Sequence, residues 1–192
     1  MKRNTLIPGG ARARQSTRCH EQSAWARWRG SVFPVVQIIH DRERSVDLEE
    51  FLARPLFAHL ATASEHGPRE SPVWFLWEDH AVWIIGSRER DTFPARLEAD
   101  ARCAVGIVDF ERASGLVQHV GMRGRATVEA FDGNRARRLL KRYLGQDERT
   151  WDQRFTMTVT RPSAEQAVLL RFVPETVVAR DVSYAPHVHR SA

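Results

Sequence analysis

Cysteine, lysine and long apolar runs are all scarce in this 192-residue sequence, and each shortage excludes a class of protein. Two cysteines, Cys19 and Cys103, are too few for a disulfide framework, so a reduced cytoplasmic location is expected. No apolar run approaches the length of a membrane span, and no apolar segment of the kind that export signals need follows the basic N-terminus. We therefore expect no membrane partner.

The motifs of several common chemistries are also absent from the sequence. It contains no nucleophile elbow of the form G-x-S-x-G, no P-loop, no H-E-x-x-H and no paired C-x-x-C. The eight histidines are scattered, and the pair His187 and His189 lies in a segment that looks loose. We expect no metal site. Because no general acid stands out either, no catalytic residue is assigned.

The net charge of +5 is concentrated in the N-terminal segment. Residues 1–44 carry nine basic and three acidic side chains, whereas the rest of the chain carries 20 basic and 21 acidic ones. The nearly neutral remainder offers no footprint for nucleic acid, although a nucleic-acid-binding arm is a distant alternative for the segment itself. We predict a basic, disordered extension over 1–44, one folded domain over 45–182 and a loose tail over 183–192.

Short runs of β-branched and aromatic residues, bounded by turn residues, dominate the domain and predict strands. Such runs lie at 57–63, 72–77, 81–86, 103–108, 116–131, 166–172 and 176–179. Short helices are expected after Asp47, within 88–101 and over 132–144, where Gly145 follows as a C-terminal cap. The segment 151–158 is ambiguous. The pattern favours a mainly β fold with short helices, arranged as a small barrel of six or seven mostly antiparallel strands.

The predicted strand over 72–77 is apolar on both faces. Because side chains alternate along a strand, Val73, Phe75 and Trp77 share one face, and Trp74 lies on the other. One face is expected to fill the barrel and the other to meet a partner subunit or a flat ligand. Simple core packing is the alternative for any single tryptophan.

Two polar features are candidates for ligand contacts. The turn after the third predicted strand could offer hydroxyls, backbone N–H groups and a guanidinium to a phosphate through Ser87, Arg88, Arg90 and Thr92. His119 lies in the middle of the long predicted strand, near bulges or bends expected at Gly121 and Gly124. For this histidine an ordinary place at the barrel edge and a ligand contact, including a haem ligand, both stay open.

The order of these motifs resembles the pyridoxamine 5'-phosphate oxidase-like split-barrel family, over roughly Val46 to Asp181. The likeness lies in F-L-A-R-P-L-F-A-H-L-A-T-A-S at 51–64, S-P-V-W-F at 71–75, the segment 86–102, V-G-M-R-G-R-A at 120–126 and V-P-E-T-V-V-A-R-D at 173–181. The resemblance implies a six-stranded antiparallel split β-barrel that forms a homodimer, with the cofactor in clefts between the subunits.

The resemblance also implies which residues hold the cofactor. They are Ser71, Pro72, Val73, Trp74 and Phe75 along the second strand, Ser87, Arg88, Arg90, Thr92 and Phe93 in the phosphate turn, and His119 on the fifth strand. Phe93 stands where the family commonly has a lysine or arginine, so a cation is missing from the turn. Arg88, Arg90 or Arg96 could replace it.

Members of the family bind flavin mononucleotide (FMN), a deazaflavin coenzyme or haem, and some only carry their cofactor. We predict an FMN- or deazaflavin-dependent oxidoreductase that transfers a hydride to or from a small organic substrate. A non-catalytic flavin- or haem-binding protein with the same barrel is the alternative. The fold carries no information about the substrate.

Overall fold

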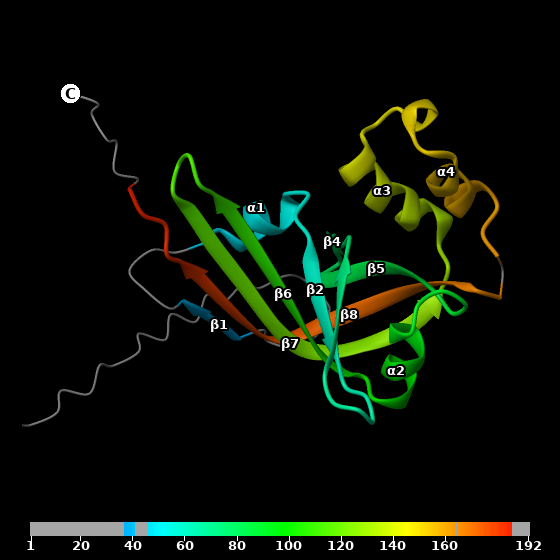
Figure 1. Ribbon diagram of the computed structural model, residues 1–192, viewed down its shortest axis with the longest axis horizontal. Coiled ribbons are helices and arrows are strands. Elements are labelled where there is room, and N and C mark those ends of the chain that lie inside the picture. Colours follow the sequence, from blue (N-terminus) through cyan, green and yellow to red (C-terminus); the bar gives the residue numbers. More distant parts are fainter. Residues whose placement is uncertain (1–36, 41–45, 164, 186–192) are drawn as a thin grey trace, which may run out of the picture.

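The computed structural model describes residues 37–40, 46–163 and 165–185. The strands are β1 (Gln37–His40), β2 (Ala58–Thr62), β3 (Arg69–Val73), β4 (Leu76–Glu78), β5 (Ala81–Ser87), β6 (Arg102–Glu111), β7 (Leu116–Ala130) and β8 (Ala167–Asp181). The helices are α1 (Leu48–Ala53), α2 (Phe93–Ala99), α3 (Gly133–Leu144), the 3₁₀ turn η1 (Glu148–Thr150) and α4 (Gln153–Thr160) (Figure 1).

The strands form one sheet in the order β3-β2-β6-β7-β8-β5-β4, with β1 added beside β8. All neighbours on the main path are antiparallel, whereas β1 pairs with β8 in parallel. The two ends of this path, β3 and β4, are separated by only Trp74 and Phe75 in the sequence. Two residues span so short a distance that the sheet must curl until its edges meet. The predicted class, a mainly β antiparallel barrel with short helices, is therefore confirmed.

The predicted second strand is two strands in the structure, so the antiparallel path has seven strands and not six. Val73 pairs with Ala58 of β2, whereas Leu76 pairs with Trp83 of β5. The alternation of apolar side chains continues from Val73 to Trp77, so the sequence does not show that the strand is interrupted after Val73. Phe75 is fully buried inside the barrel, together with Val73, as the alternation predicts.

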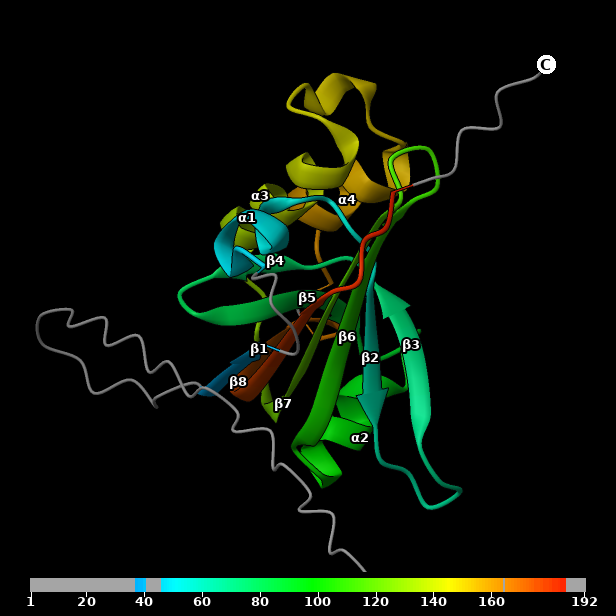
Figure 2. The same ribbon diagram turned by 90° about the vertical axis from the view of Figure 1, so that its left-hand side faces the viewer.

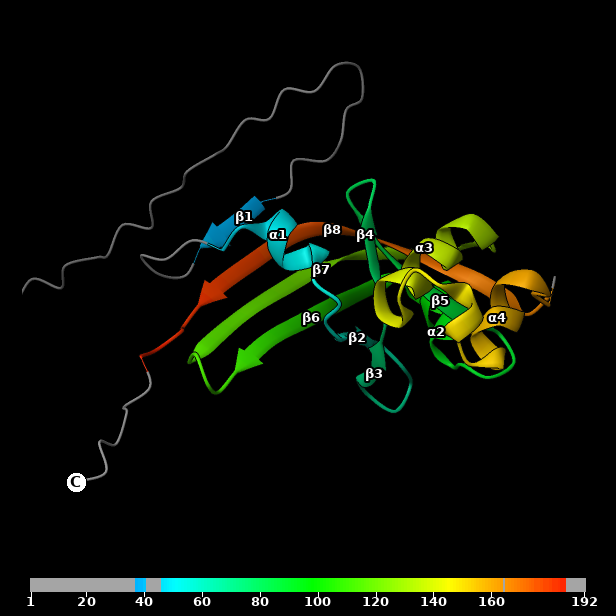
Figure 3. The ribbon, with the colours of Figure 1, turned by 90° about the horizontal axis from the view of Figure 1, so that it is seen from above.

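The core has two large parts and a small third cluster of Ala81, Trp83 and Leu169. The barrel interior is filled by side chains of the sheet, and the helices α1 and α2 close its two ends through Phe51, Leu52, Phe93 and Leu97 (Figure 2). A second cluster lies outside the barrel, where α3 and α4 sit together over one end of the sheet (Figure 3). Trp74 packs in this second cluster. The outer face of its segment therefore contacts helices of its own chain, and not only a partner or ligand as expected.

The helix α3 follows from its sequence. The Asp132 carboxylate accepts hydrogen bonds from the N–H groups of Asn134 (2.8 Å) and Arg135 (3.2 Å), and Gly145 ends the helix with a φ of 90°. Its buried side chains, Ala136, Leu139 and Leu140, recur at the spacing of one helix face. The predicted helix over 132–144 is confirmed.

Both predicted terminal segments contain ordered backbone. Residues 37–40, expected within a disordered extension, form β1, because β8 offers a free edge for pairing there. The expected tail continues along β7, since Val182 N–H donates to Val117 O and Tyr184 N–H donates to Gly115 O, each at 2.9 Å. Residues 1–36 and 186–192, with the pair His187 and His189, lie outside the described residues.

A register shift between Arg123 and Gly124 bends β7 where it pairs with β8. A Cβ on Gly124 would lie against the carbonyl oxygen of Val173 and 2.9 Å from Pro174 Cα, so no larger residue fits. The predicted bend at Gly124 is confirmed, whereas Gly121 pairs regularly with Gly106 and Val178.

We expect Gly124→Ala to lower the free energy of unfolding by about 3 kcal/mol, because the added methyl group must push two backbones apart. Gly133→Ala is the matched control, since a Cβ there makes only ordinary contacts, the nearest with Val159 O at 3.7 Å. Urea denaturation of both variants measures the difference. Equal stability of the two would contradict the close backbone approach at Gly124.

Candidate functional site

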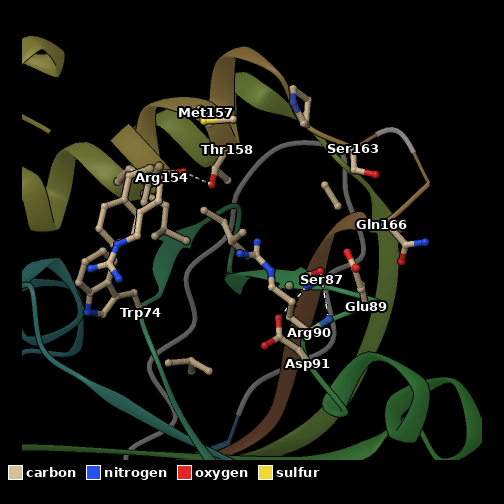
Figure 4. Close-up of a pocket in the computed structure, with 18 of the residues that line it drawn as sticks. Trp74, Ser87, Glu89, Arg90, Asp91, Arg154, Met157, Thr158, Ser163 and Gln166 are labelled. Carbon is tan, nitrogen blue, oxygen red and sulfur yellow. Dashed lines mark hydrogen bonds between the residues drawn. The ribbon is translucent and has the colours of Figure 1, made fainter. Parts of the chain in front are cut away.

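A cleft of about 660 Å³ opens between β3, the end of β5 and the helices α3 and α4 (Figure 4). Its volume lies within the range of about 300–1,000 Å³ that small-molecule sites have. The turn after β5 forms one wall, and α4 with the segment that leads to β8 forms another. The cleft therefore collects residues that are far apart in the sequence.

The turn wall is held in place by its own hydrogen bonds. Ser87 N–H donates to the Asp91 carboxylate (2.7 Å), and Asp91 N–H donates to Ser87 O (2.9 Å). Arg88 N–H donates to Gln166 O (2.8 Å), which ties the turn to the segment before β8. The backbone of the turn is thereby fixed, and the nearly buried Ser87 hydroxyl faces the cleft.

Arg90 gives this wall one positive charge, and Glu89 and Asp91 give it two negative charges. The Arg90 side chain extends from the turn into the cleft (Figure 4), and no described residue forms an ion pair with it. The Asp91 carboxylate accepts a hydrogen bond from Ser87 N–H, so this N–H group is not available to a ligand. The turn can therefore offer an anion a hydroxyl and a guanidinium, while the backbone N–H groups of Ser87, Arg88, Arg90 and Asp91 already donate within the chain.

The opposite part of the cleft is aromatic. The Trp74 ring lies between the rings of Tyr143 (centroids 4.7 Å apart, interplanar angle 2°) and Phe155 (5.3 Å, 26°). Phe57 packs at an angle against Trp74 (6.4 Å) and Tyr143 (6.5 Å), and 57% of its surface is exposed. Both faces of the indole are thus covered by rings of the same chain.

Tyr143 anchors this stack to the barrel. Its hydroxyl donates to Leu56 O (2.7 Å) and accepts from Phe75 N–H (3.1 Å). Burial raises the pKa of the Tyr143 hydroxyl above its ordinary value near 10. The hydroxyl therefore stays protonated at neutral pH and keeps both hydrogen bonds.

The structure brings only some of the predicted cofactor contacts into the cleft. Those that line it are Pro72, Val73, Trp74, Ser87, Arg90 and Phe93. Those that do not are Ser71, Phe75, Arg88, Thr92 and His119. The Phe75 side chain fills the barrel, Arg88 pairs with Glu98 (2.6 Å), and the Thr92 hydroxyl accepts a hydrogen bond from Arg96.

His119 lies on the outer face of the sheet, opposite Val108 of β6 and Arg180 of β8. Its ring covers Gly121, where a Cβ would come within 3.1 Å of the imidazole Cε1. Burial, and to a smaller extent the nearby Arg180, lowers the pKa of His119, so its imidazole is neutral at pH 7.

Sequence reasoning missed the contribution of α4 to the site. Arg154, Phe155, Met157 and Thr158 of this helix line the cleft, as does Arg161 just after it. The signal that could have found the helix is its N-terminal cap, since the Asp152 carboxylate accepts a hydrogen bond from Arg154 N–H (2.9 Å). The apolar pattern of α4 is weak, since only Val159 is buried in it, and this explains why the segment 151–158 is ambiguous in the sequence.

Among the described residues, no group of three or more histidine, cysteine, aspartate or glutamate side chains could hold a metal ion. Within the same residues, no helix is long and apolar enough to cross a membrane.

The fold is thus a curled antiparallel barrel with a cleft of small-molecule size between β3, the end of β5 and the helices α3 and α4. The family model described as pyridoxamine 5'-phosphate oxidase matches residues 47–179. The chain therefore belongs to this family, and the predicted resemblance is confirmed. Among curated proteins no match is found.

Solved structures share the fold at low sequence identity. A conserved hypothetical protein from Mycobacterium tuberculosis is 16% identical, with a TM-score of 0.59, covering 78% of this chain and 96% of its own. An F420 reductase is 22% identical (TM-score 0.52; 70% and 98% covered). The haem storage protein from Vibrio cholerae is 15% identical (TM-score 0.52; 67% and 88% covered). At these identities the likeness establishes the fold alone.

We expect Tyr143→Phe to lower the free energy of unfolding by about 1–3 kcal/mol at pH 8, because Phe75 N–H and Leu56 O lose their partner. The raised pKa also makes a prediction about pH. The folded chain holds the phenolic proton longer than the unfolded chain, so this stabilisation is complete below pH 10 and is lost as pH rises through the folded pKa.

The wild-type protein should therefore lose stability above pH 10 more steeply than Tyr143→Phe does, in urea denaturation across pH 8 to 11. Tyr184→Phe is the control, because Tyr184 is half exposed. The assignment of this pH dependence to Tyr143 fails if Tyr184→Phe reduces the loss of stability above pH 10 as much as Tyr143→Phe does.

Proposed function

We propose that this protein is an FMN- or deazaflavin-dependent oxidoreductase whose cofactor binds in the cleft. The observation that carries the proposal is that the turn with Ser87 and Arg90 shares one cleft with β3. A phosphate and a planar ring of one molecule can thus be held at the same time. When bound, such a cofactor accepts and returns a hydride, and the protein supplies binding and orientation.

The turn fits a phosphate because another residue supplies the cation that is missing at Phe93. Phe93, at the position where the resemblance places a cation, is buried in the barrel core and supplies no charge. Arg90 takes over that role, together with the Ser87 hydroxyl. The carboxylates of Glu89 and Asp91 oppose a phosphate and set a limit on how tightly it binds.

The backbone of β3 fits the polar edge of a flavin-type ring. β3 ends the sheet, and among the described strands only β2 pairs with it. The other edge of β3 therefore has backbone N–H and C=O groups free to hydrogen-bond a ligand. Pro72 and Val73 of this strand line the cleft, and Pro72, which has no N–H group, can offer only its carbonyl oxygen.

The active form in this proposal is a homodimer. Val108 and Phe110 point away from the barrel on β6 and are 51% and 59% exposed. Next to them the paired glycines Gly106 and Gly121 flatten the outer face of the sheet. A flat apolar face of this kind supports association with a second copy of the chain.

A non-catalytic haem-binding protein is the second candidate. It is favoured by His119, whose neutral imidazole is the form that ligates iron and whose cross-strand neighbour Val108 is apolar. This site would lie outside the cleft.

The absorption spectrum of protein purified from its natural host distinguishes these candidates. We expect flavin bands in the blue or a deazaflavin band closer to the violet, whereas a sharp Soret band would favour haem. A colourless protein that binds none of the three on titration would contradict both candidates.

Titration with FMN tests the phosphate site. Arg90→Gln should weaken FMN binding roughly tenfold, because a charge-assisted hydrogen bond is lost. Asp91→Asn should strengthen it roughly threefold, because a repelling charge is removed while an acceptor for Ser87 N–H remains. Riboflavin, which lacks the phosphate, should respond to neither change.

Arg88→Gln is the matched control, since Arg88 lies outside the cleft and pairs with Glu98. If it weakens FMN binding as much as Arg90→Gln does, the phosphate site is assigned to the wrong part of the turn.

Phe110→Glu should shift the protein from dimer to monomer in size-exclusion chromatography, because the dimer would bury an unpaired charge. Gln146→Glu adds the same charge at an exposed position after α3 and should leave the elution unchanged. A Phe110→Glu variant that elutes with the wild type would show that this face is not the interface.

A further inference from the structure

A second depression lies beside α2, and it shares no lining residue with the cleft. It has a volume of about 510 Å³ and opens between α2 and the turn that joins β2 to β3 (Figure 2). We call it the α2 groove. Three alanines and a serine leave room in it for a small ligand, and its ionisable lining residues are Glu65, His66, Arg96 and Asp100.

Arg96 is the partly buried cation of the α2 groove. Its Nε–H group donates to Thr62 Oγ1 (2.7 Å), and an Nη1 N–H group donates to Thr92 Oγ1. Both acceptors are neutral hydroxyls, and no described carboxylate forms an ion pair with Arg96. A guanidinium has five N–H groups, so three of those on Arg96 have no partner in the described part of the chain.

Packing within the chain does not account for a charge at Arg96. Connecting α2 to β2 through Thr62 requires one N–H donor, which a neutral amide side chain also has. A charge costs more to bury than a neutral polar group unless a counter-ion accompanies it. Burial lowers the pKa of Arg96, and the charge of Arg69 lowers this pKa further. The described residues therefore do not supply the counter-ion that this guanidinium needs.

Arg69 adds a second positive charge on the same face of the sheet. It lies opposite Thr62 in the pairing of β2 with β3, so both side chains point to one face. This is the face on which Thr62 contacts Arg96. Arg69 is exposed, and none of the described residues forms an ion pair with it. The two guanidiniums repel each other, and an anion bound between them would remove that repulsion.

The carboxylates that line the α2 groove do not neutralise these two arginines. Asp100 accepts hydrogen bonds from the Arg102 side chain, through Nε (3.0 Å) and Nη2 (2.7 Å), and from Arg102 N–H (3.0 Å). These bonds lower the pKa of Asp100 to about 2, and Arg102 compensates its charge. Glu65 is exposed and has no ion pair with a described residue, so it opposes an anion from the rim of the groove.

We infer that the α2 groove is a second anion site, which binds the phosphate group of a small phosphomonoester between Arg96 and Arg69. The free N–H groups of Arg96 can donate to two oxygens of one phosphate. A phosphomonoester carries close to two negative charges at neutral pH, which matches two guanidiniums, whereas a carboxylate carries one. This site is independent of the function proposed for the cleft.

Titration of the full-length, ¹⁵N-labelled protein with inorganic phosphate tests this site, because NMR signals of backbone N–H groups report which residues the ion approaches. We expect the signals of residues 63–66 and 95–100 to shift, on a binding curve distinct from that of residues 87–91 in the cleft. Acetate should bind in the groove at least tenfold more weakly. Unchanged signals in the groove, or equal affinities for acetate and phosphate, would overturn the proposal.

Variants assign the site to its residues. Arg96→Gln should weaken phosphate binding in the groove roughly tenfold, and Arg69→Gln roughly threefold, because each removes a charged donor. Glu65→Gln should strengthen it roughly twofold, because an opposing charge is removed. Arg90→Gln is the matched control, since Arg90 lines the cleft and not the groove, and it should leave the affinity of the groove unchanged.

The exposed positions keep this test valid if Arg96→Gln disturbs α2. Arg69 and Glu65 are exposed, so their substitution should leave the fold intact, as circular dichroism checks. If neither Arg69→Gln nor Glu65→Gln changes the affinity of the groove, or if Arg90→Gln weakens it as much as Arg96→Gln does, the proposal is overturned. Failure of FMN to bind in the cleft would contradict the proposed function and leave the groove site standing.

Discussion

The two-residue crossing at Trp74 and Phe75 is the constraint on which the rest of this structure depends. It joins the two ends of the sheet, and the barrel closes because so short a link leaves no other arrangement. It also sends Phe75 into the barrel and Trp74 out into the cleft. Tyr143 fixes α3 to the crossing through Phe75 N–H and Leu56 O. The same two residues thus position the core and the aromatic end of the site.

The chemistry of the cleft follows from which elements reach it. The turn after β5 brings the Ser87 hydroxyl, the Arg90 guanidinium and the carboxylates of Glu89 and Asp91 to the cleft. The helix α4 brings Phe155 and a second arginine, Arg154, to the other end of the cleft. Between them β3 offers a free backbone edge.

Several parts of the fold and site could be predicted because their signals are local. The caps Asp132 and Gly145 bound α3, and the alternation of Val73, Phe75 and Trp77 identifies the face that fills the barrel. Other parts depend on pairing over long distances. The break after Val73 arises because β2 and β5 each bind one half of an unbroken apolar run. The sequence around His119 looks like a ligand strand, yet β6 and β8 hold it on the outer face.

The sequence by itself determined the mainly β class, the family and the polar turn at Ser87, because hydrophobic alternation, capping and turn residues act over a few positions. Only the tertiary structure decided which polar residues share a cleft. It placed Arg90 in the cleft and Arg88 outside it, against Glu98, although the two lie in one turn. It also brought Arg154 and Phe155 to Trp74 across about 80 residues of chain. Such meetings depend on how the sheet curls and where the helices dock, and no short stretch of sequence encodes either.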